Sequence, residues 1–77
     1  MTDLGRLRWR CRRGMKELDV LLERWLERHA ATAEPDEIRC FEALLGLQDP
    51  QLARYLLAGD PHPDFATAAL IERIRRA

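Results

Sequence analysis

The sequence predicts an all-α fold, a single small bundle of five short helices. Two observations lead to it. Apolar residues recur at the three- and four-residue spacing of helices and rarely alternate with polar ones, as strands require. Prolines, glycines and aspartates then divide the 77 residues into five such segments. Since 77 residues and 9.0 kDa leave room for one domain only, we expect residues 1–77 to form a single helical domain.

The first two predicted helices meet at Gly14. The first runs from Asp3 to about Arg12, and Gly14 interrupts its short apolar stripe. The second, from about Met15 to Ala30, has the most regular pattern of the chain. The residues of its broad apolar arc, expected to face the core, are Met15, Leu18, Leu21, Leu22, Trp25, Leu26 and His29.

The opposite face of the second helix is charged, with one exception. Glu17, Arg24 and Arg28 lie on that side, and Val20 is an apolar residue among them. If the helix began early, Arg13 would join this face four residues before Glu17.

Proline and aspartate mark the starts of the other three helices. Pro35 suits a first helical turn because proline has no N–H to lose there. Asp49 is expected as the N-cap of the fourth helix, which Gly59 ends, and Asp64 as the N-cap of the fifth. The apolar stripes of these helices are Ile38, Phe41, Leu44 and Leu45, then Leu52, Tyr55 and Leu56, then Thr67, Leu70, Ile71 and Ile74.

The formal charge is zero, but basic residues gather at the N-terminus. Thirteen Lys and Arg balance thirteen Asp and Glu, yet residues 1–16 carry a net +5 and the other 61 residues a net −5. Such a cluster suits nucleic acid, an anionic cofactor or an acidic protein surface, because all three work by the same Coulombic attraction. Charge alone does not choose among them, or between them and a solvated basic helix.

The sequence lacks a constellation for catalysis. Serine is absent, and His29 and His62 have no evident partner, so their roles stay open. The glycines are too scattered for a phosphate-binding loop. Cys11 and Cys40 form neither a CxxC pair nor a zinc motif, and we interpret both as reduced thiols in the core. We therefore predict that the protein is not an enzyme and holds no metal.

Targeting signals are also missing from the sequence. No apolar run approaches the roughly 18 residues that cross a bilayer, and residues 1–13 lack the apolar core of a signal peptide. We therefore expect a bacterial cytoplasmic protein without membrane insertion.

The junction of the first two helices carries a family motif. It reads Trp9-Arg10-Cys11-Arg12-Arg13-Gly14-Met15-Lys16-Glu17-Leu18-Asp19. This segment resembles the Arg-Gly-x-x-Glu motif of the succinate dehydrogenase assembly factor 2 and bacterial FAD assembly (flavinylation) factor family, and its flanking residues make the match specific. Downstream, the segments that look like the rest of the family are Phe41-x-x-Leu44-Leu45, Asp49-Pro50-x-Leu52 and Tyr55-Leu56. Tyr55 departs from the pattern, because relatives often have tryptophan there.

The resemblance implies a chaperone-like assembly factor. Such a factor binds the flavoprotein subunit of succinate dehydrogenase, and in bacteria also of fumarate reductase, and promotes the covalent attachment of FAD to it. The histidine that becomes linked to the flavin belongs to the partner, which agrees with the missing catalytic constellation. We expect a monomer when free and no stably bound cofactor, and the sequence leaves open whether FAD touches this chain.

The resemblance also implies a partner-binding surface at the junction. Gly14 lets the chain turn sharply and lets a partner backbone come close. Arg13 offers a planar set of donors to a carboxylate or carbonyl group, and Glu17 either holds Arg13 or reaches a donor on the partner. The expected partner-binding residues are Arg13, Gly14, Glu17, Arg12, Met15, Asp19, Trp9 and Arg6.

Two other interpretations stand beside this one. In the first, Gly14 is only an N-cap and Glu17, at N3, reaches back to the cap N–H. In the second, the chain is a small nucleic-acid-binding or regulatory helical protein that uses the Arg-rich first helix, with Trp9 as a stacking surface. The acidic remainder of the chain would repel phosphates, so we expect no nucleic-acid partner.

Overall fold

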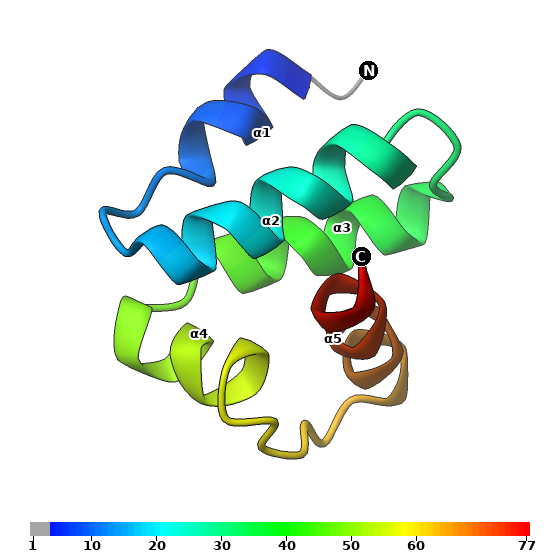
Figure 1. The fold of residues 1–77 in the computed structure, drawn as a ribbon. Coiled ribbons are helices and arrows are strands. Elements are labelled where there is room, and N and C mark those ends of the chain that lie inside the picture. Colours follow the sequence, from blue (N-terminus) through cyan, green and yellow to red (C-terminus); the bar gives the residue numbers. More distant parts are fainter. Residues whose placement is uncertain (1–3) are drawn as a thin grey trace.

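The computed structural model describes residues 4–77, which fold into five helices without a strand (Figure 1). This confirms the predicted all-α bundle. Asp3, the expected start of the first helix, lies outside the described residues. The helices are α1 (Leu4–Arg10), α2 (Lys16–His29), α3 (Pro35–Leu45), α4 (Asp49–Leu56) and α5 (Phe65–Arg76).

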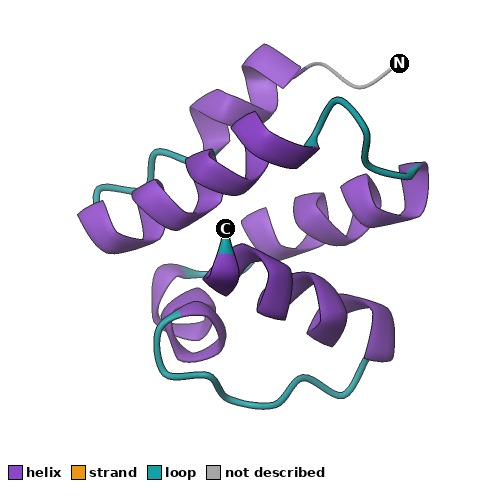
Figure 2. Ribbon diagram, turned by 45° about the vertical axis from the view of Figure 1, so that its right-hand side comes forward, coloured by secondary structure: helices purple, strands orange, loops and turns teal. Residues whose placement is uncertain are grey.

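The last helix packs against three of the other helices. α5 packs against α2, α3 and α4, and α2 also packs against α4. Figures 1 and 2 show α1 on one side of α2, with α4 and α5 on the other. The C-terminus returns to α2, where Arg24 Nη1 donates a hydrogen bond to the Ala77 carbonyl oxygen at 2.8 Å. The C-terminal end of the chain is thus anchored to α2.

The core is built from the predicted stripes. Trp25 and Phe41 are fully buried and stack with their ring centroids 4.5 Å apart. Two members of the arc predicted for α2 are not in the core. Met15 is 38% exposed because it precedes the helix in an extended conformation, and His29 is exposed at the last position of α2.

The two cysteines differ in their surroundings. Cys11 is fully buried, whereas Cys40 is half-buried and packs against the core, and neither forms a disulfide. Burial, with a smaller contribution from Glu23, raises the pKa of the Cys11 thiol to about 12. Because the thiolate is the nucleophile, Cys11 is inert at neutral pH.

Two of the predicted helix starts have different outcomes. Asp64 is the N-cap of α5, as predicted, and accepts hydrogen bonds from Thr67 N at 2.9 Å and Thr67 Oγ1 at 2.7 Å. Asp49 was expected to cap α4, but Gln48 precedes the helix and Asp49 is its first residue. The Asp49 carboxylate instead accepts a hydrogen bond from Arg13, far away in sequence.

We expect Asp64→Ala to make the free energy of unfolding less dependent on pH in the acid range. The hydrogen bonds from the Thr67 hydroxyl and N–H hold the pKa of the Asp64 carboxyl below its ordinary value. A carboxyl with a lowered folded-state pKa contributes stability above its unfolded-state pKa, and this contribution is lost as the pH falls through the folded-state pKa. The stability difference between wild type and variant should therefore shrink on acidification.

Urea denaturation of both proteins, from neutral pH down to about pH 3, measures this difference. A difference that stays constant over that range would contradict the expectation.

Candidate partner-docking site

The Arg13 side chain is bound within the molecule and is only 14% exposed. Its Nε donates to Asp49 Oδ1 at 2.7 Å, Nη1 donates to the Leu45 carbonyl at 2.6 Å, and Nη2 donates to the Leu47 carbonyl. We call these contacts the Arg13 clamp. They join the junction between α1 and α2 to the junction between α3 and α4, two places more than thirty residues apart in the chain.

The clamp differs from the role expected for Arg13. The donors that we expected it to offer to a partner are used by Asp49 and two backbone carbonyls. The suggestion that Glu17 holds Arg13 is wrong, because Asp49 does so. Sequence reasoning missed Asp49 as an ion-pair partner, since an Asp-Pro pair signals a helix start and carries no sign of a contact 36 positions away.

The backbone of Arg13 is also anchored. Its N–H donates to Asp19 Oδ1 at 2.7 Å, and Asp19 lies one turn into α2. Asp19, expected as a partner-binding residue, is half-buried and uses one carboxylate oxygen inside the molecule. Arg13 is therefore held at both its main chain and its side chain, which leaves the following residues in a defined position.

Gly14 makes the turn that follows. Its φ of +87° lies in the left-handed region, where side chains other than hydrogen are strained. A Cβ atom built on Gly14 would meet no heavy atom within 4 Å. The backbone of Gly14 therefore favours glycine, whereas the space beside it is open.

Helix α2 starts one residue later than the capping interpretation requires. Met15 is the N-cap residue, makes no side-chain cap hydrogen bond, and is followed by Lys16 as the first helical residue. The interpretation of Gly14 as N-cap and Glu17 at N3 is thus wrong. Glu17 is exposed in the first turn of α2 and, within residues 4–77, makes no hydrogen bond or ion pair. We call residues 13–17 the Gly14 corner.

The other expected site residues lie close to this corner in the chain. Arg12 is 66% exposed, and its Nε lies 3.6 Å from a carboxylate oxygen of Glu23. Its guanidinium carbon lies 5.8 Å from the centroid of the Trp9 ring, within the range of a cation–π contact. Trp9 itself is 71% exposed. Arg6 is exposed on α1.

The histidines lie away from the corner. The His29 ring lies 6.2 Å from that of Trp25. The His62 ring lies 5.0 Å from that of Tyr55, and His62 Nδ1 accepts a hydrogen bond from Asp64 N at 3.0 Å. Both therefore make structural contacts.

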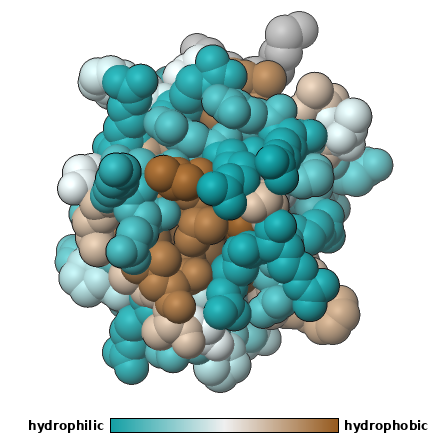
Figure 3. All heavy atoms as spheres, viewed as in Figure 1, coloured by the Kyte–Doolittle hydropathy of each residue, from teal (hydrophilic) through white to brown (hydrophobic). Residues whose placement is uncertain are grey.

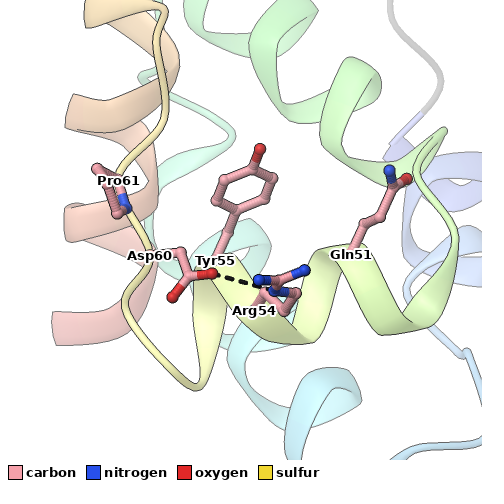
Figure 4. A pocket seen from close by; sticks show the side chains of 5 residues that line it. All are labelled: Gln51, Arg54, Tyr55, Asp60 and Pro61. Carbon is pink, nitrogen blue, oxygen red and sulfur yellow. Dashed lines mark hydrogen bonds and ion pairs between the residues drawn. The ribbon is translucent and has the colours of Figure 1, made fainter.

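A surface hollow beside α4 also lies outside the corner (Figure 4). Its only charged lining groups, Arg54 and Asp60, bind each other at 3.1 Å. The residues that line it are Gln51, Arg54, Tyr55, Asp60 and Pro61. In the described part of the chain, no three His, Cys, Asp or Glu residues are grouped to hold a metal ion. None of the described helices is long and apolar enough to span a bilayer.

Comparison with known proteins points to one family. A family model described as "flavinator of succinate dehydrogenase" matches residues 5–77. The chain is 39% identical to a protein of Haemophilus ducreyi, over 97% of this chain and 94% of that protein. It is 43% identical to a protein of Methylococcus capsulatus, over 97% and 90%. For a protein of Xylella fastidiosa the values are 42%, over 96% and 76%.

All three relatives carry the name FAD assembly factor SdhE. The matches span the Gly14 corner, the Arg13 clamp and all of the helices, so the likeness is not confined to a short motif. This chain belongs to the family of succinate dehydrogenase flavinators.

Proposed function

We propose that this chain binds the flavoprotein subunit of succinate dehydrogenase, and also that of fumarate reductase, and promotes the covalent attachment of FAD to it. Family membership and the names of the relatives support the role toward succinate dehydrogenase; the extension to fumarate reductase is part of the proposal alone. The observation that carries the docking site is the exposure of residues 14–17 of the Gly14 corner, where the Glu17 carboxylate is bound by no residue of the described part of the chain. In this proposal the chain acts as a cytoplasmic monomer. FAD binds to the partner and becomes covalently attached to it.

Two parts of the motif have different tasks in this proposal. Gly14 and Glu17 contact the partner: the open space beside Gly14 admits a partner backbone, and Glu17 accepts from a partner donor. Arg13 is a positioning residue, because its side chain is occupied by the clamp. A surface that is already rigid loses little conformational entropy on binding, so more of the contact energy becomes affinity.

The exposed residues on the approach to the corner add attraction and contact area. Trp9, stacked beside Arg12, presents the kind of side chain that dominates many protein interfaces. The net +5 of residues 1–16 accelerates encounter with an acidic surface on the flavoprotein. Arg6 and Met15, both exposed, extend this contact on either side.

Promotion of flavinylation then follows from differential binding. The chain has no need to touch the reacting atoms if it binds more tightly to the flavoprotein conformation in which the partner's own residues attack FAD. A ligand shifts such an equilibrium by the ratio of its affinities for the two conformations. The proposal therefore requires no catalytic side chain in this protein.

We expect Glu17→Ala to lower covalent flavin on a co-expressed flavoprotein subunit by at least about tenfold, since loss of a charged interface partner costs about 2 kcal/mol or more and tenfold corresponds to about 1.4 kcal/mol. Flavin fluorescence of the subunit in a denaturing gel measures the attachment. Glu27→Ala, which removes another exposed glutamate of α2 far from the corner, should leave it unchanged.

Circular dichroism must show both variants folded. Equal covalent flavin with and without the wild-type chain would refute the proposed function. Wild-type activity of Glu17→Ala would refute the role of the corner.

A further inference from the structure

A shallow apolar hollow of about 370 Å³ lies between α2 and the C-terminal end of α4. Val20 and Leu21 of α2 line it, together with Leu57, the residue that follows α4. Lys16 and Glu17 complete the lining. Figure 3, in the view of Figure 1, shows hydrophobic surface between hydrophilic regions on the face that α2 and α4 share. We call this feature the apolar hollow.

The exposed residues of the hollow contribute little to the core. Val20 is 40% exposed and Leu57 is 37% exposed, while Leu22, two residues after Val20, and Leu56, just before Leu57, are buried at 0% and 2%. Val20 is also the apolar residue that interrupts the charged face of α2. Single exposed aliphatic side chains are common on protein surfaces. Here, however, two of them line one hollow with Leu21, so their apolar surfaces are contiguous.

The hollow is continuous with the Gly14 corner. Glu17 belongs to both, and Val20 follows Glu17 by three residues, almost one helical turn. The Arg13 clamp also fixes the geometry of the hollow, because it ties the start of α4, at Asp49, to the residues just before α2. Helix α4, which is followed directly by Leu57, is thereby tied to the start of α2 before any partner arrives.

We propose that the apolar hollow is the second half of the docking surface and receives an apolar side chain of the flavoprotein subunit, next to a basic residue that pairs with Glu17. This inference rests on the proposed function. The apolar walls match an aliphatic or aromatic side chain, and the unpaired Glu17 carboxylate at the edge selects a cationic neighbour. Side chains that fill a well-packed, desolvated pocket on the partner are typical of interface hot spots.

A comparable exposed apolar residue elsewhere provides a matched control. Phe65, at the start of α5, is 88% exposed and lines a different hollow between α3 and α5. No residue of the Gly14 corner lines that hollow. A glutamate at position 65 also suits the first turn of a helix, so Phe65→Glu should fold.

The test is calorimetric titration of the purified flavoprotein subunit with the wild-type chain and with the variants Val20→Glu, Leu57→Glu, Phe65→Glu and Glu17→Ala. We expect the two hollow variants to weaken Kd about tenfold or more, and Phe65→Glu to change it less than about twofold. The heat-capacity change of binding should be less negative for the hollow variants, because less apolar surface is buried. If a glutamate variant fails to fold, Val20→Ala or Leu57→Ala is measured in its place, because alanine adds no charge. These variants should weaken Kd about threefold.

Failure of this inference can be told apart from failure of the proposed function. Wild-type affinity of both hollow variants, together with lost binding by Glu17→Ala, would overturn the hollow and leave the Gly14 corner standing. An equal loss of affinity with Phe65→Glu would also overturn it, since the effect would not be specific to the hollow. A wild-type chain that does not bind the subunit at all would overturn both.

Discussion

Arg13→Ala is expected to lower the free energy of unfolding by about 2–3 kcal/mol, because it leaves a charge and two backbone carbonyls without their donors. In the clamp, one guanidinium group donates hydrogen bonds to the Asp49 carboxylate and to the carbonyls of Leu45 and Leu47, and the arginine side chain is 14% exposed. Asp49 is 36% exposed, so water recovers part of the loss and keeps the effect below that of a fully buried pair. For a domain of this size, Tm should fall by roughly 10–20 °C.

Thermal and urea denaturation followed by circular dichroism measure this effect. Arg12→Ala is the matched control, since its side chain is 66% exposed and its ion pair with Glu23 should be worth less than about 1 kcal/mol. Arg13→Lys should recover only part of the loss, because an ammonium group lacks the planar donors that reach Asp49 and both carbonyls together. If Arg13→Ala were as stable as Arg12→Ala, the clamp would not exist in solution.

Substitution of Gly14 should lower covalent flavin attachment strongly while lowering the free energy of unfolding only slightly. Gly14→Ala places a Cβ in open space but forces a left-handed φ, so we expect a stability loss of about 1 kcal/mol. Covalent flavin on the co-expressed subunit should fall about tenfold or more, because the added side chain occupies the space that a partner backbone needs. Asparagine tolerates the left-handed region better than alanine. Gly14→Asn should therefore be more stable than Gly14→Ala yet equally inactive.

Gly59 is a matched control for this experiment. It also has a positive φ, of +77°, and a Cβ there would lie 2.8 Å from Arg75 Nη1, the far end of a flexible side chain. Gly59→Asn should therefore cost stability without changing covalent flavin. If covalent flavin falls in proportion to the loss of stability in Gly14→Ala, Gly14→Asn and Gly59→Asn alike, Gly14 has a structural role only. Attachment that falls only at position 14 would support the docking role.

The family membership supports the assembly-factor interpretation of the basic N-terminus and not the nucleic-acid alternative. Composition alone favours neither interpretation, because an acidic protein surface and a nucleic acid both attract a basic segment by their negative charge. The flanking residues of the Arg-Gly-x-x-Glu segment separated them, because they match a family whose partner is a protein.

Most of the fold could be predicted because its signals are local. The start of α3 at Pro35, the N-cap at Asp64 and the turn at Gly14 each depend on backbone preferences of one or two residues. Met15 shows where this fails: a helical spacing assigned it to the apolar arc, but the extended residue before a helix does not share the helix's faces. Asp49 shows the same limit. It was expected as the N-cap of α4, but it is the first residue of the helix, one position after the N-cap.

The sequence by itself determined the number and order of the helices, their buried faces and the family motif at the first junction. Only the tertiary structure decided which motif residues face outward. Helix periodicity and capping depend on neighbours three or four positions apart, whereas the Arg13 clamp joins groups separated by 32 to 36 positions. No local pattern encodes such a contact, so the division between an inward-bound Arg13 and exposed Gly14 and Glu17 emerges only when the helices pack.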